Sequence, residues 1–394
     1  MERRLSKILL VSVILAAALS LASVFRSAAF QDSPTGTPEW TPIPLPTQLY
    51  NALGPDNFPD SVNPLTGLVV ADPGSLERRP LMIKISNYPR SVRPQSGLSR
   101  ADTVYEYYLE QGITRFIGIF YGQDAEKAGP VRSGRFFDEH IFRMYQAIFI
   151  FSGADDRVMD YIMDLDRSLL GRLMIEHPSD LRQSCGQDRA VPLCRDRQIS
   201  GYNNLFANTS AASQAITARG IDNQRQDLPG LRFERFPPLG GTPAPEVEFV
   251  YSSFSFNRWL YLPSTGRYLR YQDTRDRTSA EGGDDAPLLD SLTQEVVAAE
   301  NVVALFVPHR YYIHTATTEM VRIDLVGSGQ AVLFRDGQSF PARWIRPADG
   351  LLFLTTPGGA LLPLKPGVTF YQVLSETSSA TQESSGWQFE FWIH

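Results

Sequence analysis

Short runs of apolar, β-branched and aromatic residues, each closed by turn-forming residues, recur along most of this chain. Such runs are typical of buried strands. In the first half, the predicted strands are residues 81–85, 103–109, 114–121 and 147–152. Between the third and fourth runs, Phe137, Ile141 and Met144 recur at helical spacing. This pattern predicts a helix that begins near Ser133, and a second helix follows Gly153. Residues 61–240 are therefore predicted to form an α/β domain, with a mixed sheet and flanking helices.

The second half contains almost only strand patterns. The runs are residues 247–251, 259–262, 268–271, 302–307, 321–325, 331–334, 342–345, 351–354 and 368–373, and the one helical pattern lies near residues 287–295. Asp336-Gly337 between two runs predicts a tight hairpin. A stretch rich in Pro and Gly ends near Pro243 and suits a domain boundary. We therefore predict a smaller β-rich domain over residues 244–375, and an α+β fold class overall.

The last residues, 376–394, predict a flexible tail with an aromatic end. The interpretation we favour is that the aromatic end adds as a strand to a sheet edge of its own protein. Binding of a partner or of the membrane interface stays open as an alternative.

The beginning of the chain carries an export pattern. Arg3, Arg4 and Lys7 precede an apolar run over residues 8–24, and Ser27-Ala28-Ala29 follows it. Residues 1–29 are therefore predicted to be a cleaved signal peptide or an uncleaved membrane anchor. The Pro/Thr-rich residues 30–60 predict an extended linker that holds the folded part away from the membrane. No Cys stands directly after the apolar run, so we expect an extracytoplasmic protein, membrane-anchored or secreted, that is not linked to lipid through a cysteine.

Two cysteines, Cys185 and Cys194, are the only thiols in 394 residues. In an oxidising compartment, a pair this close in sequence predicts a local disulfide. Metal binding would need further ligands at suitable spacing, and we expect neither a metal nor a cofactor. Asp156, Asp160 and Asp164 share a helix face, which we interpret as a solvated acidic face.

The distribution of charge is more informative than its total. A net charge of −6 argues against a nucleic-acid binder. From Arg78 to Arg135, however, eight Arg and two Lys stand against five acids. This excess predicts a site for an anionic small molecule or envelope polymer. A helix beginning near Ser133 would add free N–H groups to that site. The candidate ligand-binding residues are Asn87, Arg93, Ser96, Glu106, Arg115, Arg132, Ser133 and Arg135. The alternative is that these arginines pair with Asp102, Glu106 and Glu110 in a structural network.

Two other function classes remain open beside this binding module. The chain lacks a Gly-x-Ser-x-Gly elbow, a Walker loop, a dinucleotide fingerprint and a His-Glu-x-x-His motif. Glu106 and Glu110 would share a face of an unbroken strand, which allows an envelope glycan hydrolase with these two as catalytic carboxylates. A scaffold that engages a protein partner through the β domain or the aromatic tail is the third possibility.

Four motifs carry a resemblance to a known family. They are Asn63-Pro64-Leu65-Thr66-Gly67, Arg93-Pro94-Gln95-Ser96-Gly97-Leu98, Gly112-Ile113-Thr114-Arg115-Phe116 and Gly129-Pro130-Val131-Arg132-Ser133. The chain from about Asn63 to Leu374 resembles the YerB-like lipoprotein family, a bacterial family of unknown function. The resemblance implies an N-terminal α/β domain and a smaller β-rich domain, and it supplies no activity. Tyr202-Asn203-Asn204 stands where the family has Pro-His-Asn, so no role of that histidine carries over.

Overall fold

The computed structural model describes residues 52–177, 183–186, 190–278, 283–348, 350–383 and 386–394. Tyr50–His394 form one compact unit. The predicted signal or anchor, 1–29, lies outside the described residues, as does the predicted linker up to residue 51. Among the described residues, no helix combines the length and the apolar character that a membrane crossing requires.

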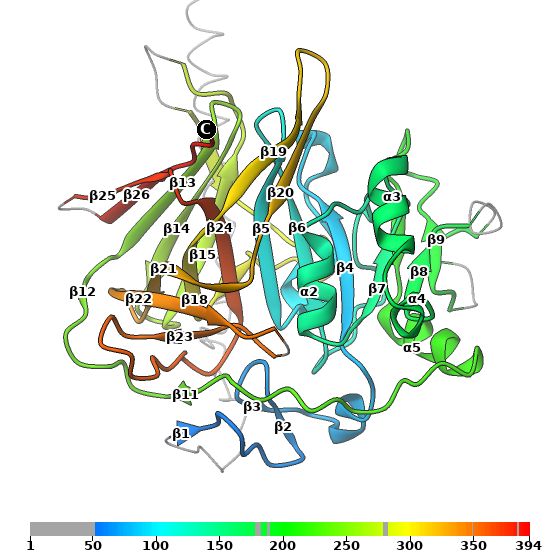
Figure 1. Ribbon diagram of the computed structural model, residues 1–394, viewed down its shortest axis with the longest axis horizontal. Coiled ribbons are helices and arrows are strands. Elements are labelled where there is room, and N and C mark those ends of the chain that lie inside the picture. Colours follow the sequence, from blue (N-terminus) through cyan, green and yellow to red (C-terminus); the bar gives the residue numbers. More distant parts are fainter. Residues whose placement is uncertain (1–51, 178–182, 187–189, 279–282, 349, 384–385) are drawn as a thin grey trace, which may run out of the picture. The chain divides into compact units, whose positions relative to one another are not determined.

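A mixed eleven-stranded sheet forms the centre of the fold (Figure 1). Its order is β12 (Thr242–Pro243), β22 (Gln338–Arg346), β21 (Gly327–Arg335), β18 (Asn301–Val307), β24 (Thr369–Ser375), β5 (Thr103–Glu110), β6 (Ile113–Phe120), β4 (Leu81–Ser86), β7 (Ile148–Phe151) and β8 (Leu173–Ile175), with β23 (Phe353–Thr355) paired to β22. Strand β24 lies parallel to both β18 and β5. It therefore joins strands from the two halves of the sequence in one sheet.

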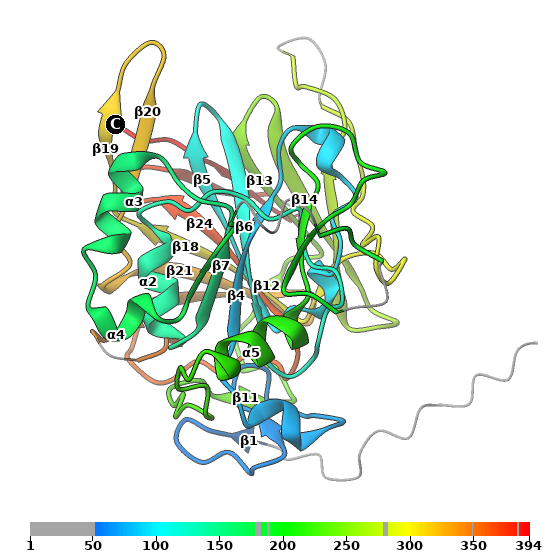
Figure 2. The same ribbon diagram turned by 90° about the vertical axis from the view of Figure 1, so that its right-hand side faces the viewer.

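A seven-stranded sheet packs against one face of the larger one (Figure 2). Its order is β16 (Asp285–Pro287), β15 (Arg267–Asp273), β14 (Ser255–Leu262), β13 (Glu246–Ser252), β26 (Gly386–Glu390) and β25 (Ser379–Gln382), with β17 (Ala298–Ala299) paired to β15. Strand β26 comes from the aromatic end of the chain and pairs in parallel with β13. Phe389 is fully buried there, stacked on Phe249. The aromatic end adds to the β13 edge of its own sheet, as the favoured interpretation has it, and β25 pairs with its outer side. The predicted flexible tail therefore contributes two strands, β25 and β26.

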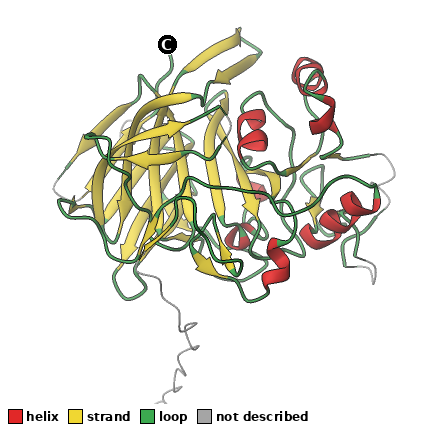
Figure 3. Ribbon diagram, turned by 60° about the horizontal axis from the view of Figure 1, so that its bottom comes forward, coloured by secondary structure: helices red, strands yellow, loops and turns green. Residues whose placement is uncertain are grey.

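The helices lie together on one side of the strands (Figure 3), and α3 and α4 lie beside β7 and β8 (Figure 1). They are α2 (Asp138–Met144), α3 (Asp156–Met163), α4 (Arg167–Leu170) and α5 (Thr209–Ala218), with short 3₁₀ turns at Pro73–Leu76, Arg90–Val92 and Leu98–Arg100. Four strand pairs complete the fold: β1 (Ala52–Leu53) with β11 (Phe233–Glu234), β2 (Val62–Asn63) with β3 (Leu68–Val69), β9 (Leu193–Arg195) with β10 (Leu205–Ala207), and β19 (His309–His314) with β20 (Glu319–Ile323).

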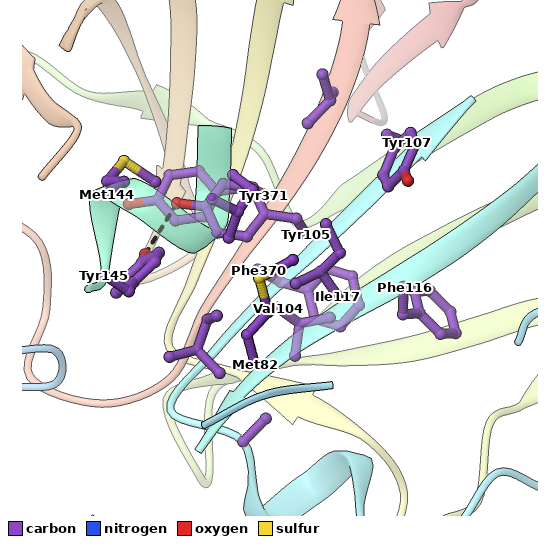
Figure 4. Close-up of a cluster of buried hydrophobic side chains, with 14 of the residues drawn as sticks. Met82, Val104, Tyr105, Tyr107, Phe116, Ile117, Met144, Tyr145, Phe370 and Tyr371 are labelled. Carbon is purple, nitrogen blue, oxygen red and sulfur yellow. Dashed lines mark hydrogen bonds between the residues drawn. The ribbon is translucent and has the colours of Figure 1, made fainter. Parts of the chain in front are cut away.

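The two faces of the larger sheet bury different aromatic clusters. Toward the helices, Tyr105 stacks on Tyr371 with ring centroids 4.6 Å apart and exchanges a hydrogen bond with Tyr145 of the chain after α2 (Figure 4). Toward the smaller sheet, Phe370 meets Trp259 with centroids 4.8 Å apart. Because alternate residues of a strand point to opposite faces, neighbours such as Phe370 and Tyr371 serve different layers.

The predicted strands appear, and the fold is β-rich with helices in its first half. The α+β class holds only in this coarser form. The structure corrects two helix predictions. Helix α2 begins at Asp138 rather than near Ser133, because Arg132 N–H and Gly134 N–H still bond across to Lys84 and Gly153. Residues 287–295 form no helix, because the Asp290 carboxylate accepts N–H bonds from Gly97, Ser99 and Leu292 and thereby fixes a turn.

The domain boundary near Pro243 stays a prediction. Both predicted domains contribute strands to the larger sheet, where β24 of the second pairs with β5 of the first. If the two parts folded separately, each would lose the pairing between β24 and β5.

Candidate functional site

The predicted site residues divide between the two faces of the larger sheet. Glu106 points from β5 toward the smaller sheet, where it contacts Asn257 of β14. Tyr107, the next residue, points toward the helices and bonds to Asp138 of α2. The candidates therefore form two separate groups rather than one cleft.

The first group is a buried polar network between the two sheets. The Glu106 carboxylate accepts hydrogen bonds from Asn87 Nδ2 at 3.1 Å, Thr114 Oγ1 at 2.7 Å and Asn257 Nδ2 at 3.2 Å. It also forms an ion pair with Arg270 at 2.8 Å, and both side chains are buried. The Arg270 guanidinium stacks near the Phe116 ring as well. A buried carboxylate with this many partners has little capacity left for a ligand.

Arg93 extends this network toward the surface. Its guanidinium pairs with the Asp273 carboxylate at 3.0 Å and donates to the Asn87 carbonyl at 2.9 Å. Arg90 pairs with the same Asp273 at 2.7 Å and with Asp276 at 2.7 Å. These residues, with Asn87, Thr114, Glu106, Asn257 and Arg270, are called the inter-sheet network below. The sequence left open the alternative that these arginines form a structural network, and this group fits that alternative in part. The carboxylate that pairs with Arg93, and the arginine that pairs with Glu106, come from the second half of the chain.

Ser96 has a backbone role. Its hydroxyl donates to the Lys127 carbonyl at 2.5 Å, and its N–H bonds to the Gly129 carbonyl. It lies in neither group.

Glu110 lies on the opposite face of the sheet from Glu106. The pairing of β5 with β6 shifts between Tyr108 and Glu110, so Glu110 lies opposite Ile113. This bulge breaks the alternation that would have placed the two carboxylates together. Glu110 instead forms an ion pair with Arg135 at 2.6 Å. The two glutamates do not share a site.

The second group lies on the helix side and contains an excess of cations. Arg115 donates to the Ser133 carbonyl at 2.9 Å. Arg132 lies over the Tyr202 ring, 4.9 Å from its centroid, and Arg135 holds Glu110. Within the described chain, the Nε atoms of Arg115 and Arg132 are buried without a hydrogen-bond partner. We call Arg115, Arg132 and Arg135, with Glu110, the arginine cluster.

Mutual repulsion is visible in the electrostatics of this cluster. The pKa of Arg115 is lowered to about 9, first by burial and then by the charges of Arg135 and Arg132, while Glu110 opposes the change. Burial also lowers the pKa of Arg132, with Arg135 acting in the same direction. A bound anion would relieve both the repulsion and the missing hydrogen bonds.

A buried lysine lies beneath the arginine cluster. Lys84 Nζ pairs with the Asp138 carboxylate at 2.9 Å and contacts the Tyr107 hydroxyl, which itself donates to Asp138 at 2.6 Å. Tyr107 is labelled on its strand in Figure 4. The pKa of Lys84 is lowered to about 7, mainly by burial and also by Arg115 and Arg135, while Asp138 opposes the change. Lys84 and the three arginines therefore lie beside two paired carboxylates, Glu110 and Asp138. Asp155 also faces Arg135.

A cavity of about 400 Å³ opens beside the cluster. Ser133, Arg135, Glu110 and Asp155 line one side, and residues 317–320 of the β19–β20 hairpin line the other. Arg135 is the one cation among these lining residues. Glu319 of the hairpin accepts bonds from Tyr108 Oη at 2.7 Å and the Gln111 N–H at 3.0 Å. The hairpin thus forms one wall of the cavity.

The backbone near Ser133 offers less to an anion than the sequence indicated. The N–H groups of Arg132, Gly134 and Arg135 are all bonded within the protein, the last to the Asp138 carboxylate at 2.8 Å. The prediction that a helix beginning near Ser133 supplies free N–H groups to the site is wrong. Recognition would depend on the guanidinium groups.

The remaining sequence predictions concern cysteines and metals. Cys185 and Cys194 form the predicted disulfide. Asp156, Asp160 and Asp164 are exposed, as a solvated helix face requires. In the part of the chain that the structure describes, no three His, Cys, Asp or Glu residues gather in a way that could hold a metal ion.

Sequence reasoning missed the residues that complete both groups. Lys84 carried a signal, because a lysine inside the apolar run 81–85 must be buried with a partner. Arg270 and Asp273 carried none, because their partners lie more than 150 residues away in the sequence.

Comparison with known proteins places this architecture. Models of the family described as "Protein of unknown function (DUF3048)" match residues 65–222 with its N-terminal domain and residues 247–371 with its C-terminal domain. The chain belongs to this family. Among its relatives is the Bacillus subtilis (strain 168) protein named "Putative lipoprotein YerB", 26% identical over 341 residues, which are 83% of this chain and 91% of that protein. The resemblance seen in the sequence motifs is confirmed.

A solved structure supports the fold of this DUF3048 protein. The crystal structure of the YerB protein from Bacillus subtilis superposes with a TM-score of 0.63 at 24% identity, covering 79% of this chain and 96% of that one. Members of the family are described as proteins of unknown function, so the site itself must carry any functional argument.

Proposed function

We propose that this DUF3048 protein is an extracytoplasmic, membrane-associated binding protein that holds an anionic group at the arginine cluster. The observation that carries the proposal is the burial of the Arg115 guanidinium beside two other cations. Its guanidinium is buried beside Arg132 and Arg135, its Nε lacks a partner in the described chain, and its pKa is lowered to about 9. A protein that keeps like charges together in this way gains most when an anion binds between them.

The ligand class follows from the guanidinium groups. Arginine binds carboxylate and phosphate oxygens through paired N–H donors, so a phosphate or carboxylate suits the cluster. The cavity beside Ser133 and Arg135 is large enough for a small molecule or a charged group on an envelope polymer, which would meet the cluster at Arg135. Of the predicted ligand residues, Arg115, Arg132, Ser133 and Arg135 serve this proposal. Asn87, Arg93, Ser96 and Glu106 hold the fold together instead.

The envelope location has three supports. The basic flank and apolar run at residues 3–24 are an export pattern. The disulfide between Cys185 and Cys194 suits an oxidising compartment. The relative from Bacillus subtilis carries the word lipoprotein in its name. Both cysteines of this chain lie in the disulfide, so we propose attachment through the apolar run, if that run is not cleaved.

A glycan hydrolase based on Glu106 and Glu110 is not proposed. Paired carboxylates of that class must face one substrate from two sides. The bulge in β5 places them on opposite faces of the sheet, with Glu106 buried in the inter-sheet network.

A ligand screen by thermal unfolding tests the proposal. We expect inorganic phosphate, pyrophosphate or simple carboxylates to raise the melting temperature of the full chain, because a ligand at 100 times its Kd stabilises by about 2.7 kcal/mol. The effect should weaken at high salt. It should disappear in Arg115→Ala and persist in Arg310→Ala, whose exposed side chain pairs with Asp324 at 3.1 Å. Equal shifts in both variants, or no shift with any anion, would refute the site.

A further inference from the structure

The two most exposed large apolar side chains of the described residues lie in one loop. Phe236 exposes 67% of its surface and Leu239 exposes 101%. They are three residues apart in the segment Arg235-Phe236-Pro237-Pro238-Leu239. Scattered single apolar residues are normal on a surface, but a projecting pair suggests a binding role.

The loop is held firmly at both ends. Before it, β11 pairs with β1, and the Glu234 N–H bonds to the Leu364 carbonyl. After it, β12 pairs with β22. Pro237 and Pro238 fix two backbone φ angles between these ends. The loop therefore presents Phe236 and Leu239 to solvent between two paired strands.

The charge of the loop is positive. Arg235 is exposed, with its guanidinium 5.8 Å from the Phe236 ring centroid. The chain from 235 to 243 contains no Asp or Glu. An aromatic ring, an aliphatic side chain and an arginine together suit the boundary of an anionic bilayer, where the ring lies at headgroup level and the arginine meets phosphate.

The path of the chain points to the same partner. Ala52 pairs with Glu234, so the N-terminal segment enters the described fold directly beside this loop. That segment contains the apolar run 8–24, and 27 residues separate the run from Ala52. A tether attached at the base of the loop raises the local concentration of lipid for this face above that for any other.

We propose that the 235–239 loop inserts into the lipid headgroup region and docks this face of the protein on the membrane. Phe236 and Leu239 supply apolar contact, and Arg235 binds lipid phosphate. This inference rests on the proposed membrane association. It opposes the expectation from sequence that the linker holds the folded part away from the bilayer.

A fluorescent label decides between the two arrangements. The full chain, with its disulfide intact, is reconstituted into vesicles of phosphatidylglycerol and phosphatidylethanolamine. An environment-sensitive dye is attached to Leu239→Cys or, as the matched control, to Met163→Cys, an exposed apolar residue of α3. We expect a blue shift and quenching by brominated lipid at position 239 and neither at 163. Adding Phe236→Ser should reduce the lipid-exposed fraction at 239 about tenfold.

The outcomes separate this inference from the proposed location. A chain that floats with the vesicles while both labels stay in water overturns the docking loop and leaves the membrane association intact. Equal blue shifts at 239 and 163 indicate non-specific adsorption and also overturn it. A chain that does not float with the vesicles overturns both proposals.

Discussion

The inter-sheet network and the arginine cluster lie on opposite faces of the same strands, yet their charges are arranged differently. Between the sheets, Arg90, Arg93 and Arg270 face Glu106, Asp273 and Asp276. On the helix side, Arg115, Arg132 and Arg135 share Glu110, with the Lys84–Asp138 pair beneath. The first group is balanced by the protein itself, whereas the second has spare positive charge.

This difference distinguishes the structural group from the proposed binding group more clearly than burial does. Lys84, Glu106 and Arg270 are all fully buried, and Arg115 nearly so. A buried ion pair with good geometry is needed once it exists, because removal of one partner leaves an unpaired charge. A buried cation among like charges costs stability until a ligand arrives. The predictions below test that distinction.

The largest effect is expected for Arg270→Met. The substitution leaves the Glu106 carboxylate buried without its cation, so the free energy of unfolding should fall by about 3–5 kcal/mol. Chemical denaturation measures this loss, with Arg310→Met as the exposed control. The double variant with Glu106→Leu should cost less than the single one, because it removes both charges. A single-variant loss below about 1 kcal/mol would contradict the structural role of the network.

A pH effect of similar or smaller size is expected from Lys84, which faces Asp138, Tyr107, Arg115 and Arg135. Its pKa is lowered to about 7 in the folded protein, against about 10.4 for an unperturbed lysine. Between these values the unfolded chain binds a proton that the folded chain does not. Stability should therefore rise with pH from 7 to 9, by up to about 1.4 kcal/mol per pH unit.

Denaturation at several pH values checks this slope in the wild type against Lys84→Met, in which the Lys84 contribution is absent. Because Lys84→Met also leaves Asp138 without its cation, NMR titration of the Lys84 ammonium in the unchanged protein supplies an independent measurement. A titration near the ordinary lysine value would mean that Asp138 outweighs burial.

Arg115→Met should cost far less than the same substitution at Arg270. It removes a hydrogen bond to the Ser133 carbonyl but also a charge repelled by Arg132 and Arg135. We expect the free energy of unfolding to stay within about 1 kcal/mol of the wild-type value. Denaturation without added anions is the measurement. A loss as large as that of Arg270→Met would show that the cluster is already satisfied internally.

Local features of the sequence predicted local features of the structure. Asp336 and Gly337 both adopt positive φ angles, 54° and 72°, in the two-residue hairpin between β21 and β22. Gly329 and Trp344 lie opposite each other in that pair. A side chain on Gly329 would come within 2.5 Å of the Trp344 indole nitrogen. Such features depend on neighbouring residues and so are visible in a sequence.

The features that sort the site residues are not local. Alternation predicted a shared face for Glu106 and Glu110, but the bulge before Glu110 moved it to the other face. The partner of Glu106 is Arg270, in a different sheet. Ser133 does not start a helix, because the N–H of the preceding residue, Arg132, still bonds to the Lys84 carbonyl of β4. Only the assembled sheets show which arginines are balanced.

The smallest effect is expected for Glu110→Gln, and it has the opposite sign. Glu110 forms an ion pair with the Arg135 guanidinium at 2.6 Å and thereby competes with any anion that binds the cluster. Removing its charge should tighten the binding of inorganic phosphate about two- to fivefold, since a partly exposed ion pair contributes up to about 1 kcal/mol. Calorimetric titration measures the change. The matched control is Glu139→Gln, which removes a carboxylate bound to Arg143 at 2.6 Å on α2. If Glu110→Gln weakens binding instead, Glu110 must orient Arg135 for the ligand, and the cluster would need its single carboxylate as much as its three cations.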